Sequence, residues 1–263
     1  MPDHFFVVGA QRSGTTYLYR LLEAHPEIAM ARPLRPEPKF FLDDGQHGRG
    51  GGWYLDTYFR HAGDAAALGE KSVGYLESER AARRIAEAHP AATIVAVLRE
   101  PIARAVSHYG FSVESGVETR DIETALGGDL DLARGNAGWF EVGDTRIASD
   151  PFAYRRRGRY RDDLAVYRGL FPSEQLVVIL FEDLVSSPGG AAARLYGQLG
   201  VDPGFRPRDP DVVVNPGPRP PGLSPGLLAD LADYFREANR ALAEEFGLDL
   251  SPWDRRRGLS GAG

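Results

Sequence analysis

The sequence predicts a three-layer α/β/α fold built on a central parallel sheet. Two apolar runs, 93–98 and 175–181, are continuous rather than alternating, which is typical of strands buried on both faces of a parallel sheet. Helical patterns alternate with strands along the chain, as a doubly wound sheet requires. With 263 residues, 43% of them hydrophobic, the chain can bury one sizeable core. We therefore expect a single domain over residues 1–253.

Turn residues bound the individual elements of this predicted sheet. Apolar, β-branched runs place the strands at 4–9, 67–71, 93–98 and 175–181. Amphipathic spacing places the helices at 14–24, 77–88, 101–115, 158–170, 188–199 and 225–246. Glycine, proline or missing periodicity predicts loops at 43–52, 127–151 and 202–225 and a disordered tail at 254–263. Ligands of such folds bind beyond the carboxyl ends of the strands.

The composition excludes several classes of protein. A net charge of −6 and a pI near 5.6 argue against broad nucleic-acid binding. No apolar stretch approaches the roughly 20 residues of a membrane span. The chain has no cysteine, and its histidines lack the spacing of metal ligands, so we expect neither disulfides nor a catalytic metal.

Composition and the first residues also bear on the protein's source and location. Lys39 and Lys71 are the only lysines, while arginine, alanine, glycine and proline are abundant, which indicates a GC-rich bacterial gene. Met1 to His4 lead directly into a predicted strand without the pattern of a signal peptide, so we expect a cytoplasmic protein.

The segment 9–16, with the sequence G-A-Q-R-S-G-T-T, joins a predicted strand to a predicted helix. Backbone N–H groups at such a helix start favour an anion. The spacing G-x-x-x-x-G is that of a Walker A loop, but Thr15 and Thr16 stand where a nucleoside triphosphatase has lysine and serine or threonine. Arg12 is the only cation in the segment. The loop therefore indicates a phosphate-like ligand rather than an ordinary Mg-triphosphate.

A second candidate anion site follows the strand 93–98. Arg99 is expected at the carboxyl end of this strand, and Pro101 suits the first turn of the next helix. Ser107 lies two turns into that helix. A forked guanidinium and a hydroxyl at these positions can converge on one small anion. Two anion sites at neighbouring strand ends suggest a ligand with two separate phosphates.

Together these motifs resemble those of the PAPS-dependent sulfotransferases. The pattern G-x-x-x-x-G-T-T is followed by R-x-P-x-x-R-x-x-S-x-Y at 99–109. The segments E-P-K-F-F at 37–41, W-Y-L-D-T-Y-F at 53–59 and E-K-S-V-G-Y at 70–75 are similar to those of the heparan sulfate N- and 3-O-sulfotransferases and occur in the same order. The resemblance spans about residues 5–200 and implies the P-loop-like sulfotransferase fold.

The resemblance implies a role for each matching residue. Glu37 would be the base, with Lys71 and Arg12 as the cations beside the 5′-phosphosulfate. The cofactor-binding residues would be Arg12, Ser13, Gly14, Thr15, Thr16, Arg99, Ser107, Tyr160 and Arg219. The donor would be PAPS, the product PAP, and no metal would be needed. The acceptor would be a hydroxyl or amine of a carbohydrate or small molecule.

Two departures from the family pattern affect these roles. The heparan-type enzymes usually have lysine at the position of Arg12, and arginine cannot act as a proton donor, so Lys71 takes the larger share in stabilising the leaving group. The basic loop that helps to cover the nucleotide is not visible near the C-terminus, where only Arg219 can stand in for it.

Several alternatives remain open from the sequence. His47 and His108 are alternative bases, and Lys71 could instead form an ordinary ion pair with Glu70. A small-molecule or nucleotide kinase using Mg-ATP is the main alternative function, although Thr15 occupies the place of its lysine. A non-catalytic nucleotide-binding protein is the third.

Overall fold

A computed structural model of the chain describes residues 3–128, 140–142, 145–147, 150–207 and 222–258. The chain divides into two compact units, each formed by two stretches of sequence. Unit 1 comprises Met1–Leu98 and Ala165–Val214, and unit 2 comprises Arg99–Leu164 and Asn215–Gly263. The expectation of one domain over 1–253 stays a prediction.

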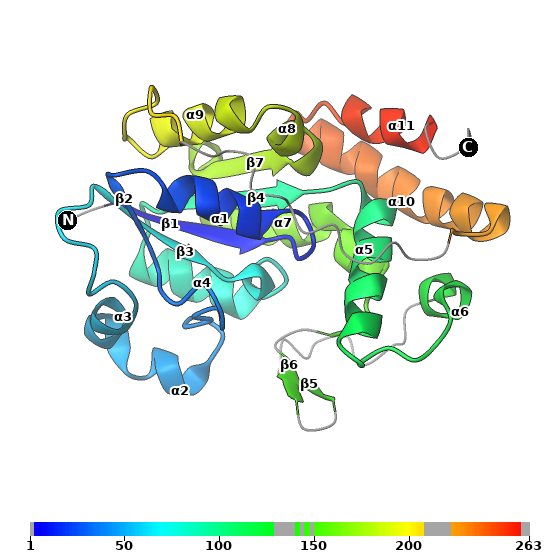
Figure 1. The fold of residues 1–263 in the computed structure, drawn as a ribbon, viewed down its shortest axis with the longest axis horizontal. Coiled ribbons are helices and arrows are strands. Elements are labelled where there is room, and N and C mark those ends of the chain that lie inside the picture. Colours follow the sequence, from blue (N-terminus) through cyan, green and yellow to red (C-terminus); the bar gives the residue numbers. More distant parts are fainter. Residues whose placement is uncertain (1–2, 129–139, 143–144, 148–149, 208–221, 259–263) are drawn as a thin grey trace. The chain divides into compact units, whose positions relative to one another are not determined.

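Unit 1 is built on a five-stranded parallel sheet with the strand order β2-β3-β1-β4-β7 (Figure 1). Its strands are β1 (Asp3–Gly9), β2 (Ile28–Met30), β3 (Ala67–Lys71), β4 (Thr93–Leu98) and β7 (Leu176–Leu180). β1 lies between β3 and β4, so the chain reverses its progression across the sheet at β1. Ligands of doubly wound sheets bind at such a switch point.

Helices pack on both faces of this sheet, and the predicted three-layer α/β/α fold is confirmed. Phe5 and Val7 of β1 point to one face, where they join a buried cluster with side chains of α1, α8 and α9. Phe6 points to the other face, where its ring lies 5.4 Å from that of His89 at the end of α4. The helices of unit 1 are α1 (Thr15–Glu23), α2 (Asp44–His47), α3 (Gly50–Tyr58), α4 (Glu79–Ala88), α8 (Phe181–Ser186) and α9 (Pro188–Gln198).

Unit 2 is mainly helical. Its helices are α5 (Pro101–Glu114), α6 (Ile122–Gly127), α10 (Pro225–Phe246) and α11 (Ser251–Gly258), with an antiparallel pair β5 (Phe140–Val142) and β6 (Thr145–Ile147). Helix α7 (Tyr160–Leu170) crosses the boundary between the units. The core of unit 2 joins α5, α6 and α10, with Ile102, Tyr109, Leu126 and Phe235 all buried.

The predicted glycine-rich loop at 43–52 is wrong, because this stretch contains α2 and the start of α3. Asp43 caps α2 by accepting a hydrogen bond from the Gln46 N–H at 2.9 Å. Glycines at the start of α3 weaken a helix, but burial of Tyr54 and Tyr58 from the same helix outweighs that cost.

Other expectations fall partly outside the described residues. Most of the predicted loops 127–151 and 202–225 lies there, as do residues 259–263 of the predicted disordered tail. The start of that tail, 254–258, is helical as part of α11. The three-residue strand β2 was not predicted, since so short an apolar run carries no periodicity.

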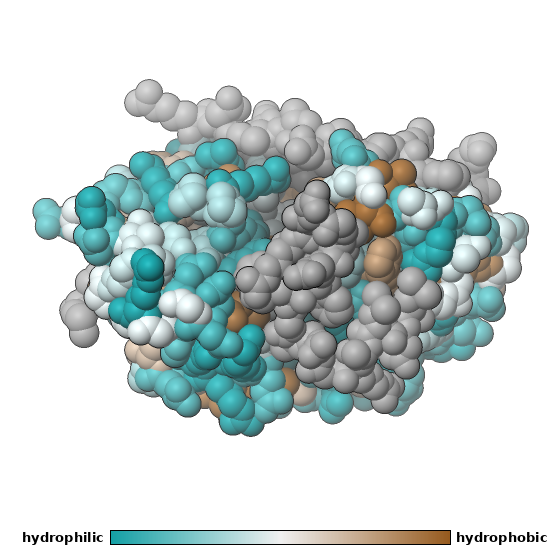
Figure 2. All heavy atoms as spheres, turned by 90° about the horizontal axis from the view of Figure 1, so that it is seen from below, coloured by the Kyte–Doolittle hydropathy of each residue, from teal (hydrophilic) through white to brown (hydrophobic). Residues whose placement is uncertain are grey.

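The surface of the described residues is largely hydrophilic. On the face drawn in Figure 2, hydrophobic residues form small patches separated by hydrophilic ones. The exposed large apolar side chains are Leu55, Phe111, Val113 and Leu228. Among the described helices, none has the length and apolar character needed to cross a membrane.

Candidate active site

The strand, turn and helix predicted around residues 9–16 are present in unit 1, and both glycines of the motif have a steric reason. A Cβ atom on Gly9 would lie 2.8 Å from the Leu76 Cβ, so only glycine allows β1 to end this close to the chain beyond β3. Gly14 has φ of 83°, and a Cβ there would lie 2.7 Å from the ring of Phe181. A left-handed conformation and a close neighbour both require glycine.

The turn before α1 has the features of an anion site. Gly14 is the N-cap of α1 and supplies no side-chain hydrogen bond to its first N–H groups. Ser13 is fully buried, and its Oγ has no hydrogen-bond partner among the described residues. Because a buried hydroxyl without a partner is costly, this atom fits a ligand oxygen. Thr15 is buried, whereas Arg12 and Thr16 are partly exposed.

The structure brings together Glu37 and Lys71, the two residues expected to act in catalysis. Lys71 is the last residue of β3 and is only 3% exposed. Its Nζ forms an ion pair with Glu37 Oε1, while Glu37 Oε2 accepts a hydrogen bond from the Val73 N–H at 3.1 Å. The alternative ion pair between Lys71 and Glu70 is wrong, because neighbouring residues of a strand point to opposite faces.

This Glu37–Lys71 pair lies beside the end of β1, from which the turn 10–14 departs. The Ser72 N–H donates to the Val7 carbonyl at 3.2 Å, and the Leu76 N–H donates to the Val8 carbonyl at 2.9 Å. The chain beyond β3 therefore runs along the last residues of β1. A carboxylate, an ammonium group and a helix N-terminus are gathered at the carboxyl edge of the sheet.

The residue before Lys71 in β3 is Glu70, whose carboxylate is buried. The sequence motifs predict no catalytic or binding role for it. Three hydroxyls donate to it: those of Ser72 at 2.6 Å, Tyr75 at 2.5 Å and Tyr54 at 2.7 Å. Burial raises the pKa of Glu70, and the three hydrogen bonds offset this only in part. The motif E-K-S-x-x-Y at 70–75 is the signal in the sequence that marks this carboxylate.

The predicted 3′-phosphate residues, Arg99 and Ser107, both belong to unit 2. Arg99 directly follows β4, as predicted, and α5 begins at Pro101. Glu100 caps this helix by accepting a hydrogen bond from the Ala103 N–H at 2.7 Å. Ser107 is partly exposed on α5, at the predicted distance along the helix. The sequence and the local structure thus agree on the elements that carry both residues.

The remaining predicted residues have different surroundings. Tyr160 is buried, and its hydroxyl donates to the Arg99 carbonyl at 2.8 Å, so it supports the backbone of Arg99. Arg104, the second arginine of the motif, is also buried and donates to the Tyr154 carbonyl. Arg219 lies outside the described residues.

The two alternative bases are engaged in packing. The ring of His108 is buried and lies 4.8 Å from that of Tyr154. The ring of His47 lies 5.4 Å from that of Phe40, and burial lowers its pKa. Over the described part of the chain, three or more His, Cys, Asp or Glu side chains nowhere gather in a group that could hold a metal ion.

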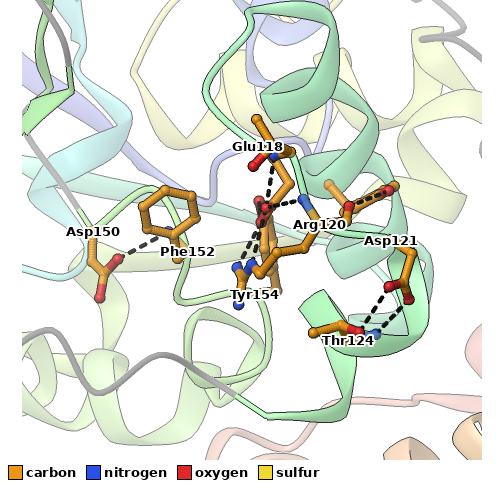
Figure 3. A network of polar contacts seen from close by, with 9 residues as sticks. Glu118, Arg120, Asp121, Thr124, Asp150, Phe152 and Tyr154 are labelled. Atoms are coloured by element: carbon orange, nitrogen blue, oxygen red, sulfur yellow. Dashed lines mark hydrogen bonds and ion pairs between the residues drawn. The ribbon is translucent and has the colours of Figure 1, made fainter.

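Unit 2 also contains a buried glutamate, Glu118, whose two carboxylate oxygens both accept hydrogen bonds (Figure 3). Its Oε2 accepts from the guanidinium of Arg120 at 2.6 Å and from the Tyr154 hydroxyl at 2.9 Å. Its Oε1 accepts from the N–H groups of Thr119 and Arg120 and from Arg120 Nε. The network fastens the turn between α5 and α6 to the segment around Tyr154.

Comparison with known proteins identifies the family. The model of a family described as "Sulfotransferase family" matches residues 2–53 and 46–206, well over half of the chain. This chain therefore belongs to the sulfotransferase family, and the class of enzyme predicted from the sequence is confirmed at that level.

Curated relatives are similar over part of their length. Mouse heparan sulfate glucosamine 3-O-sulfotransferase 6 is 29% identical over 195 residues, which cover 74% of this chain and 51% of the relative. Bovine bifunctional heparan sulfate N-deacetylase/N-sulfotransferase 2 is 30% identical over 211 residues, covering 76% of this chain and 22% of the relative. The chain thus spans about half or less of these relatives.

Solved structures are similar over nearly the whole chain. A sulfotransferase from Alicyclobacillus acidocaldarius superposes with a TM-score of 0.78 at 28% identity and covers 97% of this chain and 99% of its own. The sulfotransferase domain of the Synechococcus PCC 7002 olefin synthase has a TM-score of 0.54 at 18% identity, which supports the fold alone.

Proposed function

We propose that this protein is a PAPS-dependent sulfotransferase that sulfates a hydroxyl or amine of a carbohydrate or small-molecule acceptor. The observation that carries the proposal is the Glu37–Lys71 pair, held beside a strand–turn–helix anion site whose Ser13 hydroxyl is buried without a partner. An anionic sulfate donor and a proton-bearing acceptor need these two kinds of site side by side.

The proposed catalytic roles divide the reaction between three side chains. PAPS supplies the sulfuryl group, whose bond to the phosphate oxygen breaks as a bond to the acceptor oxygen or nitrogen forms. Glu37 accepts the acceptor's proton on a carboxylate oxygen. Lys71 and Arg12 neutralise the negative charge that builds on the phosphate side, with Lys71 as the main contributor because its ammonium group is buried next to Glu37.

The proposed donor site has two parts. Ser13, Gly14, Thr15 and Thr16 supply hydroxyls and backbone N–H groups to the 5′-phosphosulfate, in the manner of an uncapped helix start. We propose Arg99 and Ser107 for the 3′-phosphate, and Arg219 as a covering cation, on the sequence motif alone. Tyr160 contributes by holding the Arg99 carbonyl.

The names of the relatives support the proposed acceptor class. One is named as a heparan sulfate glucosamine 3-O-sulfotransferase and the other as a bifunctional heparan sulfate N-deacetylase/N-sulfotransferase. A carbohydrate hydroxyl or amine is therefore the first acceptor to test, followed by small-molecule alcohols and amines. A cytoplasmic location and a bacterial source remain predictions.

Calorimetric titration of the purified protein with PAP, ADP and Mg-ATP tests the donor class. We expect a clear preference for PAP that does not depend on Mg²⁺, followed by sulfate transfer from PAPS in an acceptor screen. A preference for Mg-ATP would favour the kinase alternative. Binding of PAP without any effect of Glu37→Ala or Lys71→Ala on an activity would favour a non-catalytic nucleotide-binding protein.

A second titration tests the proposed 3′-phosphate contact. Ser107→Ala is expected to weaken binding of PAP but not of AMP, because only PAP carries the 3′-phosphate. Equal losses for both ligands would remove Ser107 from this role.

A further inference from the structure

The segment that carries Glu37 is fastened to the body of unit 1 through two hydroxyl groups. The Lys39 N–H donates to Ser72 Oγ at 3.0 Å, and the Phe41 N–H donates to the Tyr75 hydroxyl at 3.0 Å. These are the backbone groups immediately beyond Glu37 and Pro38. The position of the proposed base therefore depends on where these two hydroxyls point.

Both hydroxyls are in turn directed by one buried carboxylate. Ser72 and Tyr75 donate their hydrogens to the same oxygen of Glu70, at 2.6 and 2.5 Å, and Glu70 is only 1% exposed. Each hydroxyl has a single hydrogen, and each directs it to Glu70 Oε1. The lone pairs of the Ser72 and Tyr75 oxygens are then left to accept from the N–H groups of Lys39 and Phe41.

No basic side chain takes part in this network among the described contacts of Glu70. The third donor is the Tyr54 hydroxyl at 2.7 Å, and the neighbouring Lys71 pairs with Glu37 instead. An arginine or lysine would satisfy a buried carboxylate more simply. Hydroxyls have a property that cations lack: while each donates its hydrogen to the carboxylate, its oxygen can accept a hydrogen bond from another group.

We propose that Glu70 is a positioning residue for Glu37, acting through Ser72 and Tyr75 on the backbone of residues 39–41. The inference rests on the proposed function, because it assumes that Glu37 is the base. Among its described contacts Glu70 makes no hydrogen bond to Glu37, and the two carboxylates interact only through their charges. Misplacement of a reacting group by about 1 Å can lower turnover about 100-fold, so a rigid backbone beyond Glu37 has a direct effect on rate.

Hydroxyl deletions with matched controls test the proposal. Ser72→Ala and Tyr75→Phe each remove one link, and Ser78→Ala and Tyr196→Phe are their controls. Ser78 and Tyr196 are equally buried, and each hydroxyl makes one backbone hydrogen bond elsewhere in unit 1, to the Ala81 N–H and the Leu21 carbonyl. The unfolding midpoint is measured for all four variants.

We expect Ser72→Ala and Tyr75→Phe to lower kcat by about tenfold or more, with the KM for the acceptor and the Kd for PAP within about twofold of wild type. The controls should keep kcat. Adding Glu70→Gln to the Ser72→Ala/Tyr75→Phe double variant should cost little further activity, because the links through which Glu70 acts are already gone. Equal kcat in variants and controls, or a parallel loss of PAP affinity, would overturn the proposal.

Amide hydrogen exchange supplies a measurement that needs no activity. Exchange at the Lys39 amide should accelerate in Ser72→Ala, exchange at the Phe41 amide in Tyr75→Phe, and both in Glu70→Gln, while the controls leave them unchanged. Unchanged exchange would overturn the positioning role. If wild type shows no sulfate transfer but these amides respond as expected, the proposed function fails and the control of this backbone by Glu70 stands.

Discussion

Two of the buried glutamates, Glu70 in unit 1 and Glu118 in unit 2, have their carboxylates stabilised by different kinds of partner. Both are almost inaccessible to water, at 1% and 4% exposure. Glu118 is neutralised by Arg120, whereas Glu70 is surrounded by the hydroxyls of Ser72, Tyr75 and Tyr54. The charge of Glu118 is balanced by a cation, which accepts no further hydrogen bond. The hydroxyls that donate to Glu70 can also accept, so they connect Glu70 to the N–H groups of Lys39 and Phe41.

The direction of the pKa differs accordingly. Burial raises the pKa of Glu118, but hydrogen bonds from Arg120 and Tyr154 and the charge of Arg120 outweigh it and leave the pKa lowered. For Glu70, burial outweighs the hydroxyl hydrogen bonds and the pKa is raised. Burial alone therefore does not mark a functional carboxylate. The two sites differ in whether the partners are cations or hydroxyls, and in whether those partners contact the segment that carries Glu37.

The largest expected effect tests whether the chemistry lies in unit 1 beside Glu70. Glu37→Gln should lower turnover by about 10²–10⁴-fold while PAP affinity changes little, because an amide cannot accept the acceptor's proton. Steady-state kinetics with PAPS and calorimetry with PAP measure the two quantities. Glu87→Gln, an exposed change on α4, is the control. A matching loss of PAP affinity would remove Glu37 from the base role.

The next largest effect concerns the stability contributed by Glu118. Glu118→Ala leaves Arg120 without its partner and the Tyr154 hydroxyl without an acceptor, so we expect the free energy of unfolding to fall by about 3 kcal/mol. Urea unfolding measures it, with Glu114→Ala on the exposed end of α5 as the control, expected within about 0.5 kcal/mol of wild type. A change no larger than that of the control would contradict the reading of Glu118 as a structural anchor.

A smaller pair of effects separates a satisfied buried hydroxyl from an unsatisfied one. Ser13→Ala should leave stability unchanged or slightly raised, since its Oγ has no partner, yet weaken PAP binding by about tenfold. Ser78→Ala should do the reverse: it removes the N-cap of α4 and lowers stability by about 1 kcal/mol without affecting PAP. Thermal unfolding and calorimetry on both variants check this; a clear loss of stability in Ser13→Ala would point to a structural hydroxyl.

The smallest effects are in the pH dependence of stability, where the two glutamates should have opposite signs. The lowered pKa of Glu118 gives a stabilisation present above its ordinary pKa of 4.5 and lost as the pH falls through the folded-state value. The raised pKa of Glu70 gives a contribution present below 4.5 and lost as the pH rises through the folded-state value.

Unfolding free energies between about pH 3.5 and pH 7 test these signs. Compared with wild type, Glu118→Gln should lose less stability toward acid, and Glu70→Gln should lose less as the pH rises. Slopes of the same sign in both variants would break the comparison.

Much of the fold could be predicted because its signals are local. The continuous apolar strands and the amphipathic helices, such as 225–246, matched the observed elements within a residue or two. The turn at 9–16 was recognisable because two glycines at a fixed spacing meet a steric requirement. The stretch 43–52 was misread because local glycines opposed helix formation, while distant partners of Tyr54 and Tyr58 favoured it.

The sequence by itself determined the layered sheet, the order of the motifs, the family and the residue types of the site, because periodicity, turn chemistry and motif spacing are properties of neighbouring residues. Only the tertiary structure decided that Lys71 pairs with Glu37 rather than with its neighbour Glu70, that the Ser13 hydroxyl is buried without a partner, and that Glu70 directs the backbone beyond Glu37. The contacts of Glu37, Lys39 and Phe41 join segments more than thirty residues apart, and the buried Ser13 hydroxyl is marked by the absence of a contact. Both depend on which side chains are brought together when the sheet forms.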